Sequence, residues 1–534
     1  MAIDIVKIFP PIGIARLGNS TDEFFIGPEI PGDYYSGPYR DSNFRIKRQA
    51  ARFRLFGYQA GSSQPATEIT LDNADEINWS VELANTKAEA EVFGKGINDP
   101  PHQNLRRNAQ VKDNRSSLMI KPESWTLTIT PSKPDVESHV FTGSFLSKKG
   151  IVLGEMRIEA PGRLIVLGGL GISDSKDPVT GEKVPLGNFS RGGGFADNDG
   201  WYDDVSDGPI NALVRMKGSD KYIKATPAWV ICAPPKFAPQ IQHIITLYDT
   251  LLQVAIDRND LRKQLDPAVV PSDIPSFTKE IYPLLIRAIN MKWVISTADA
   301  MHSHIRQILY GPHGPVGSRD QRSPIFYRLR DPGTKSDVAS VGQDMPKIWS
   351  DIYKVDNGAS ITEALKFIQY HAMDQWQKDI FKNDWPQGPS VADTAITPEG
   401  LTRAALENCV GGAFYPGIET SFNIRDKYAF VEPFRLDASQ LSPGDLTKQM
   451  CVPWQADFFD CQTDDRNMEG TSLDWWPAQR PVHVFPVDRP ENAPPVEWTR
   501  DIIINSEDMI HSWHKLGFIV KQGGDRYVET ERNG

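Results

Sequence analysis

The sequence predicts an α+β fold in three parts: a β-rich N-terminal region, a helical middle segment and an irregular, β-rich C-terminal region. Short runs of β-forming residues bounded by glycine, proline or aspartate fill the first half of the chain. A helical spacing of apolar residues begins at Phe237, and turns and aromatic residues return after Cys409. Because 534 residues exceed what one hydrophobic core usually supports, we expect domains at residues 1–236, 237–400 and 401–534.

The N-terminal region alternates β-forming runs with polar turns. Ser173–Trp201 holds many Gly, Asp and Lys residues, and we expect it to form a long surface excursion. Runs with the composition of strands are Ile5–Ile8, Trp125–Ile129, Ile151–Ile158, Arg163–Leu167 and Tyr222–Cys232.

The middle segment has the spacing of amphipathic helices. Phe237–Arg262 carries an apolar stripe, and Pro239 fits the first turn of that helix, where a missing N–H costs nothing. Phe277–Val294 and Ile361–Met373 also have helical character. Thr397-Pro398-Glu399 predicts an N-cap followed by proline at the first helical position.

The C-terminal region is rich in turns and aromatic residues. Arg425–Phe434 is predicted to form a strand pair or a bulged strand. Ile502–Val520 combines a short helix with the apolar stretch Leu516–Val520.

Composition excludes several classes of function. A net charge of −11 argues against binding to nucleic acid, because proteins bind its phosphate backbone through clustered Lys and Arg. The first twenty residues lack the pattern of a signal peptide, and no apolar run approaches the ~20 residues that cross a bilayer. Four cysteines are too few for a disulfide framework. We therefore expect a cytoplasmic protein with no membrane partner, with non-classical export left open.

The densest group of reactive side chains lies in CVPWQADFFDC, residues 451–461, and DWWPAQRP, residues 474–481. Asp457 precedes Cys461 by four residues, a spacing that puts both side chains on one face of a helical turn. A carboxylate there can act as a base toward whatever the sulfur bonds. Composition alone also allows a structural interpretation, because free cysteines are usually buried and tryptophans often line cores.

A second group is FADNDGWYDDVSDGP, residues 195–209, with five aspartates. Its spacing does not fit the twelve-residue calcium loop, so an acidic turn that presents Trp201 and Tyr202 is the better interpretation. The histidines have no partners at metal-ligand spacing, and we predict no metal site. Nucleotide-binding and hydrolase motifs are absent from the sequence.

Seven segments, taken in order, resemble the L-lysine ε-oxidase and glycine oxidase family, whose cofactor is cysteine tryptophylquinone. The segments are PPIGIARLGNS (10–20), FFIGPE (24–29), RQAARFRLFGY (48–58), FADNDGWYDDVSDGP (195–209), CVGGAFYPGIE (409–419), VPWQADFFDC (452–461) and WWPAQRP (475–481).

The resemblance implies roles for individual residues. Cys461 matches the cysteine that bonds to a tryptophan ring, and Asp457 matches the aspartate that assists formation of the quinone. Trp476 is the expected tryptophan because it stands directly before Pro-Ala, with Trp475 as the alternative. Tyr202 and Cys409 match residues that line the substrate site or its channel.

The resemblance also implies an activity and partners. The expected reaction is oxidative deamination of a small-molecule amine or amino acid, with O2 reduced to H2O2 and ammonia released. A separate flavoprotein is expected to complete the quinone, and a homo-oligomer fits the family. The fifteen residues from Cys461 to Trp476 form a shorter gap than in the family. A catalytically silent scaffold and an oxidase of peptide-bound amines therefore remain as alternatives.

Overall fold

A computed structural model gives the fold of most of the chain. The described residues are 3–61, 66–90, 107–133, 138–187, 198–267, 269–311, 314–329, 331–332, 365–385, 395–412, 417–460 and 479–533. Cys461, Trp475 and Trp476 lie outside them.

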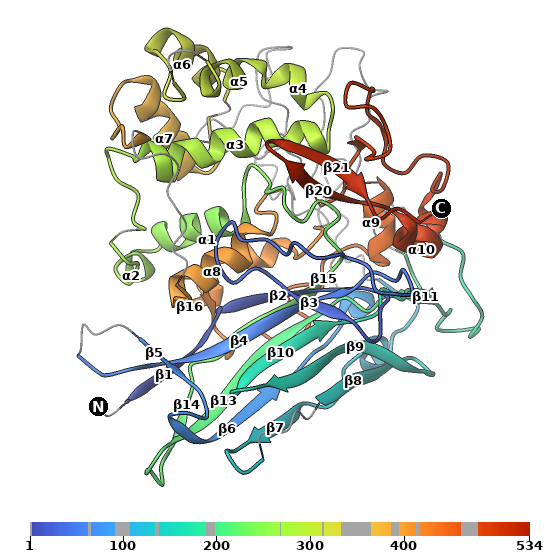
Figure 1. Ribbon diagram of the computed structural model, residues 1–534. Coiled ribbons are helices and arrows are strands. Elements are labelled where there is room, and N and C mark those ends of the chain that lie inside the picture. The colour runs from blue at the N-terminus through green and yellow to red at the C-terminus, as the bar shows by residue number, and fades with distance from the viewer. Residues whose placement is uncertain are drawn as a thin grey trace.

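One large, mainly antiparallel sheet dominates the N-terminal half of the chain, as predicted, and lies on one side of the molecule (Figure 1). Additional pairings attach β1 (Ile5–Phe9), β3 (Phe24–Ile26) and β5 (Thr67–Ile69) to β4, and β14 (Tyr222–Lys224) to β13. The order along the sheet is β7 (Trp125–Ile129), β6 (Ala74–Val81), β13 (Ser206–Met216), β15 (Ala228–Ala233), β2 (Ile12–Arg16), β4 (Arg48–Tyr58), β10 (Arg163–Gly168), β9 (Lys148–Glu159) and β8 (Ser138–Phe145).

The sheet curls until its two ends meet. Trp125 on β7 stacks on His139 on β8, with ring centroids 4.1 Å apart. The inner face follows the period of two that strands require: along β6, Ile77, Trp79 and Val81 are buried. Side chains from both ends of the sheet therefore share one hydrophobic core.

The sequence analysis located some of these strands, but β2, β4, β6, β8 and β13 were not among the predicted runs. The predicted strands at Trp125–Ile129, Ile151–Ile158 and Arg163–Leu167 are confirmed, and so is the strand at Ile5. Tyr222–Cys232 is wrong as a single strand, because it holds β14 and β15 separated by residues 225–227, where Thr226 forms an isolated bridge with Lys7.

The predicted helix at Phe237–Arg262 is wrong in its first ten residues. Helix α1 begins only at Leu247, because Thr246 and Asp249 form a capping box there: the Asp249 N–H donates to the Thr246 hydroxyl at 3.3 Å, and the Thr246 N–H donates to the Asp249 carboxylate at 2.8 Å. Ile241 and Ile245 are nevertheless buried, so their apolar spacing reflects packing of an irregular segment. Pro239 therefore lies before the helix rather than in its first turn.

The remaining predicted helices are present with shifted ends. Of the predicted helix Ile361–Met373, residues 361–364 lie outside the described part of the chain, and the helix observed there spans Phe367–Gln377. Thr397 caps α8 as predicted, accepting a hydrogen bond from the Gly400 N–H at 3.0 Å. Phe277–Val294 is helical from Phe277 to Trp293, beginning with a π-helical turn at Phe277–Ile281 and ending with a 3-10 turn at Met291–Trp293. The helices are α1 (Leu247–Ile256), α2 (Asn259–Arg262), α3 (Tyr282–Asn290), α4 (Ala298–Met301), α5 (Ser303–Leu309), α6 (Arg319–Phe326), α7 (Phe367–Gln377), α8 (Pro398–Glu407), α9 (Trp454–Asp460) and α10 (Ser506–Ser512).

Short strand pairs and single turns make up the C-terminal region, as the fold class predicted. Arg425–Phe434 is only partly extended: two 3-10 turns precede the short strand β16 (Phe430–Glu432), which pairs with β17 (Arg435–Leu436). The predicted helix and apolar stretch near the C-terminus are α10 and β20 (Phe518–Gly523), and β20 pairs with β21 (Arg526–Thr530). A third pair joins β18 (His483–Val484) to β19 (Val496–Glu497).

Helices cover one face of the sheet at β2 and β15, where α1 and α8 lie against these strands (Figure 1). Ile14 and Ile231 of the sheet share a hydrophobic cluster with Leu251 of α1 and Leu406 of α8. This packing places the end of α8 beside the ends of β2 and β15. The three domain boundaries stay a prediction.

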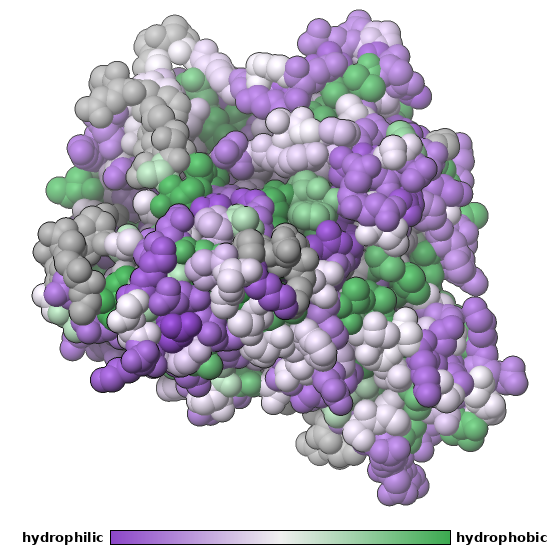
Figure 2. All heavy atoms as spheres, turned by 60° about the horizontal axis from the view of Figure 1, so that its bottom comes forward, coloured by the Kyte–Doolittle hydropathy of each residue, from purple (hydrophilic) through white to green (hydrophobic). Residues whose placement is uncertain are grey.

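The surface in Figure 2 is mixed in character, with hydrophilic residues over much of the face and smaller hydrophobic areas between them. No helix in the described ranges is both long enough and apolar enough to cross a membrane.

Candidate active site

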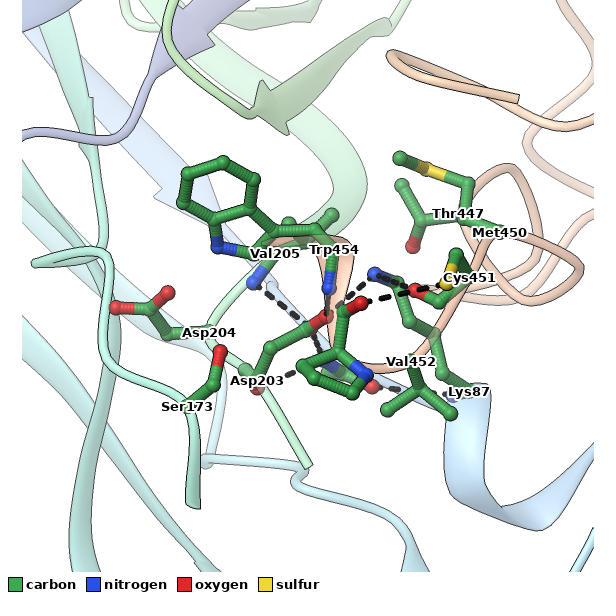
Figure 3. Close-up of polar contacts among 12 residues, drawn as sticks. Lys87, Ser173, Asp203, Asp204, Val205, Thr447, Met450, Cys451, Val452 and Trp454 are labelled. Carbon is green, nitrogen blue, oxygen red and sulfur yellow. Dashed lines mark hydrogen bonds and ion pairs between the residues drawn. The ribbon is translucent and has the colours of Figure 1, made fainter. Parts of the chain in front are cut away.

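Helix α9 carries Asp457 and leads directly to Cys461, so the contacts that hold it position the candidate site. Its first residue, Trp454, donates its backbone N–H to the Asp203 carboxylate at 2.9 Å (Figure 3). A carboxylate at this end of a helix satisfies a backbone donor that has no partner within the helix. Asp203 comes from the second acidic motif, more than two hundred residues earlier in the chain.

Asp203 is held in turn by a fully buried lysine. Lys87 Nζ lies 2.7 Å from the Asp203 carboxylate, and both side chains are 0% exposed. Lys87 also donates to the Cys451 carbonyl at 2.9 Å, and Asn85 donates to Asp203 at 2.8 Å. Figure 3 shows this group converging on the chain just before α9. Three segments distant in sequence are thereby fixed to one another by a single ion pair and its hydrogen bonds.

The acidic motif faces the interior, which corrects the predicted exposed turn. Asp203, Asp204 and Asp207 are all at most 1% exposed, and Trp201 and Tyr202 are buried as well. The sequence could not reveal this, because burying a carboxylate requires partners that other segments supply. Of the predicted surface excursion Ser173–Trp201, residues 188–197 lie outside the described part, while Ser175 and residues 198–201 are buried.

Two of these aspartates have strongly perturbed acidity. Burial raises the pKa of Asp204 to about 7, although backbone N–H groups at Leu170, Gly171 and Ile172 oppose the shift. Burial also raises the pKa of Asp207 to about 6, against hydrogen bonds from Thr447. The motif is thus a buried network that joins β13 to the segment before α9.

A different contact holds the far end of α9. Arg480 donates from Nε to the Phe458 carbonyl at 2.6 Å and from Nη2 to the Phe459 carbonyl at 3.3 Å. Arg480 is 1% exposed, and its guanidinium lies 5.6 Å from the ring centroid of Trp498. Phe458 stands three residues before Cys461, and Arg480 stands four residues after Trp476. The described residues that flank the two predicted cofactor residues are therefore in direct contact.

The described surroundings of α9 are aromatic and buried. The Trp454 ring lies 5.0 Å from the Phe458 ring and 5.4 Å from the Trp513 ring, measured between centroids. Phe237 packs edge-on against both Phe458 and Trp498. Asp457 sits within this environment and is 2% exposed. Asp457 is thus largely removed from solvent, and its role as a base stays a prediction.

Tyr202 and Cys409 pack in different parts of the protein interior. Tyr202, on the two-residue strand β12 (Trp201–Tyr202), belongs to the core of the sheet, with its ring centroid 5.0 Å from that of Phe145. Cys409 follows α8 and belongs to the cluster between α1, α8 and the sheet. Tyr202 directly precedes Asp203, so it is tied to the start of α9, whereas Cys409 contacts Arg16 at 3.8 Å. A pocket shared by Tyr202 and Cys409 stays a prediction.

Buried charges that the sequence analysis did not single out lie near Cys409. Arg16 Nη2 is 2.5 Å from Glu419 Oε1, and both side chains are at most 3% exposed. Lys236 Nζ donates to the side chain and the carbonyl of Asn408. The only available signal was that Arg16 and Glu419 fall within the family-like segments. In the described ranges, no group of three or more His, Cys, Asp or Glu side chains is arranged to hold a metal ion.

Comparison with known proteins shows the family. A family model described as the N-terminal part of L-lysine epsilon oxidase matches residues 9–232. A second model, described as the L-lysine epsilon oxidase C-terminal domain, matches residues 343–477. The chain belongs to the L-lysine ε-oxidase family. The two matched ranges include Tyr202, Cys409, Asp457, Cys461 and Trp476.

Relatives of this family align over most of the chain. L-lysine 6-oxidase of Marinomonas mediterranea is 27% identical over 555 residues, covering 88% of this chain and 72% of the relative. The crystal structure of L-Lys epsilon-oxidase from the same organism matches with a TM-score of 0.77 and 23% identity, over 99% of this chain and 95% of the other. Its Schiff base intermediate with L-Lys matches with a TM-score of 0.74, the same identity and the same coverage. Membership in this oxidase family supports an amine or amino-acid oxidase activity.

Proposed function

We propose that this chain is an amino-acid oxidase whose cofactor is cysteine tryptophylquinone, built from Cys461 and Trp476. The substrate is a primary amine carried by a small molecule, most simply an amino acid. The carbon that bears the amine is oxidised by two electrons, water replaces the nitrogen to give a carbonyl product and ammonia, and O2 takes up the two electrons and two protons to give H2O2. The M. mediterranea relative is named for lysine, which makes lysine the first substrate to test.

The observation that carries the proposal is the contact made by Arg480. It joins the end of α9, three residues before Cys461, to the segment that follows Trp476. A thioether between sulfur and indole requires two segments held rigidly at contact distance. The buried guanidinium, with two backbone carbonyls as acceptors, supplies such a link between the flanking residues.

The residues around α9 fit a quinone in chemistry as well as in position. A quinone supplies adjacent carbonyls that react with an amine and accept two electrons, which no ordinary side chain can do. The aromatic side chains of Phe237, Trp454, Phe458 and Trp498 limit water around the site. Asp457 is the buried carboxylate of α9, and we assign it the proton transfers that cofactor formation requires.

The Asp203–Lys87 pair has a positioning role in this proposal. It fixes the first residue of α9 and the chain before it, and so sets the direction in which the helix presents Asp457. Displacement of a catalytic group by even a fraction of a side-chain length lowers the rate strongly. Trp475 stays the alternative for the cross-link, and the flavoprotein partner and the homo-oligomer stay part of the proposal.

Peptide mapping by mass spectrometry tests the cofactor directly. The protein, produced together with the flavoprotein partner, is expected to give one cross-linked species containing the Cys461 and Trp476 peptides. Trp475→Phe should retain the cross-link and Trp476→Phe should lose it. Separate, unmodified peptides from protein produced with the partner would favour the silent-scaffold alternative.

A peroxide-coupled assay tests the reaction. Quinone-containing protein is expected to release H2O2 and ammonia in equal amounts from at least one member of a panel of amino acids and amines. Turnover of peptides alone would support the alternative in which the amine is peptide-bound. A quinone-containing protein that oxidises neither free nor peptide-bound amines would contradict the proposed function.

A further inference from the structure

A compact group of buried polar side chains lies where the ends of β2, β15 and α8 meet. It comprises side chains that are each at most 5% exposed: Arg16, Lys236, Asn408, Cys409 and Glu419. Arg16 ends β2, Lys236 follows β15, and Asn408 and Cys409 follow α8. We refer to these five residues as the Arg16–Lys236 cluster.

When Lys236 is protonated, the cluster carries one more positive than negative charge. Glu419 is matched by Arg16 at 2.5 Å, and its second oxygen accepts the Val410 N–H at 2.6 Å. Lys236 donates only to neutral oxygens, the Asn408 carbonyl at 3.2 Å and the Asn408 side chain at 2.5 Å. In the part of the chain that the structure describes, no carboxylate oxygen lies within 4.0 Å of Lys236 Nζ.

An unmatched buried ammonium is unusual, because burying a charge without a counter-charge costs several kcal/mol. Lys87, which is 0% exposed, follows the rule, since its ammonium is paired with the Asp203 carboxylate. A second donor in the cluster is also unused: Arg16 Nε is buried and has no acceptor among the described residues. The cluster therefore offers an anion both a charge and free hydrogen-bond donors.

The cluster lies next to the segments that flank the proposed cofactor. The backbone N–H of Phe237, the residue after Lys236, donates to the Gln479 carbonyl at 3.1 Å. The Phe237 ring lies 6.3 Å from the Phe458 ring of α9, measured between centroids. Gln479 stands three residues after Trp476, so the backbone that carries Lys236 is bonded to the chain that carries the predicted tryptophan.

We propose that Arg16 and Lys236 bind the carboxylate of the amino-acid substrate. The inference rests on the proposed function and names the substrate class more narrowly, as amines that carry a carboxylate rather than plain amines. The substrate carboxylate would supply the missing negative charge and accept hydrogen bonds from Lys236 Nζ and Arg16 Nε. Charge-assisted hydrogen bonds of this kind are the strong ones in a closed site.

The acidity of Lys236 agrees with this role. Burial, reinforced by the positive charge of Arg16, lowers the pKa of Lys236 to about 7, while Glu419 and Cys409 act in the opposite direction. Since a bound carboxylate favours the charged form of the lysine, binding near pH 7 should be coupled to proton uptake. An amine without a carboxylate should bind with no such uptake.

Comparison of matched substrate pairs tests the inference in the mature oxidase. Each pair consists of an amino acid and the amine that lacks its carboxylate, such as L-lysine with 1,5-diaminopentane and glycine with methylamine. Lys236→Met should lower kcat/KM for the amino acids about 10- to 100-fold and leave the amines unchanged or improved. Lys236→Arg, which retains the charge, should restore part of the loss.

Lys47→Met is the matched control, because Lys47 is also largely buried but is paired with Glu23 at 3.1 Å. Lys47→Met should leave kcat/KM unchanged for both the amino acid and the amine of each pair. If Lys236→Met lowers kcat/KM equally for amino acids and amines, or lowers it for neither, the inference is overturned while the oxidase activity stays in place.

A binding measurement separates this inference from the proposed function. Calorimetry on unmodified protein, with L-lysine and 1,5-diaminopentane as probes in two buffers of different ionisation enthalpy, needs no quinone. Wild-type protein should bind L-lysine with proton uptake, and Lys236→Met should lose both the uptake and most of the affinity. Such a result in a protein that never forms a quinone would support the carboxylate site and contradict the oxidase. Binding of L-lysine that is equal in wild type and variant would overturn the site alone.

Discussion

Replacing Lys87 by methionine should destabilise the protein by about 3–5 kcal/mol, although methionine fills nearly the same volume. The pair Lys87–Asp203 is 0% exposed on both sides and 2.7 Å apart. Removing the ammonium leaves the Asp203 carboxylate buried with hydrogen bonds from Asn85 and the Trp454 N–H, but without a counter-charge. The cost is that of an uncompensated buried anion, which exceeds the cost of a missing hydrogen bond.

Chemical denaturation, followed by tryptophan fluorescence, measures this change. The double variant Lys87→Met, Asp203→Asn is the control, because it removes both charges and leaves a neutral amide to accept from Trp454. The double variant should recover a large part of the lost stability, which corresponds to a coupling energy on the order of 2–3 kcal/mol in the double-mutant cycle. A Lys87→Met variant within about 1 kcal/mol of wild type, the range of an exposed ion pair, would refute the reasoning.

Three further outcomes follow from buried charges. Burial raises the pKa of Asp204 to about 7 from 3.8 in the unfolded chain, so the folded state holds this proton more tightly and the contribution of Asp204 to wild-type stability falls as pH rises from about 4 to 7. Asp204→Asn should lack this fall, and its free energy of unfolding relative to wild type should rise by roughly 4 kcal/mol over that range; a constant difference would contradict the assignment. The contribution of Lys236 to stability changes with pH in the opposite direction, because its lowered pKa makes the unfolded state bind more protons than the folded state above pH 7. Lys236→Met should therefore match or exceed wild-type stability at pH 6 and lose that advantage toward pH 10. Chemical denaturation at the two pH values measures this difference. Asp457→Asn should abolish the visible absorbance of the quinone while costing less than about 2 kcal/mol, whereas a purely structural Asp457 would give lower stability with full absorbance.

Local patterns predicted those elements whose cause is local. Strand β7 was located to the residue because β-forming side chains and flanking polar residues coincide there. The cap of α8 was predicted correctly because Thr397 satisfies a backbone donor only three residues away. The Phe237–Ile245 segment was mistaken for helix, since burial of an irregular segment against the C-terminal region imitates a helical period.

The site was predicted in part. The resemblance singled out both the acidic motif and the motif around α9, and the structure brings Asp203 of the first onto Trp454 of the second. The resemblance could not reveal that Lys87 completes this contact, because nothing in the sequence around Lys87 distinguishes it from a surface lysine. Arg480 falls within the family-like segment that holds Trp476, but its bonds to the end of α9 depend on how two distant segments fold together.

By itself, the sequence determined the α+β class, several of the strands and the family, because these depend on short-range patterns of side chains. Only the tertiary structure decided which charges are buried and with whom. Lys87 and Asp203 are 116 residues apart, and Arg16 meets Glu419 from the opposite end of the chain. The physical reason is that the acidity and the energetic cost of a charge depend on its solvent exposure and on its nearest counter-charge. Both are properties of the packed chain, and residue type and neighbours in sequence fix neither.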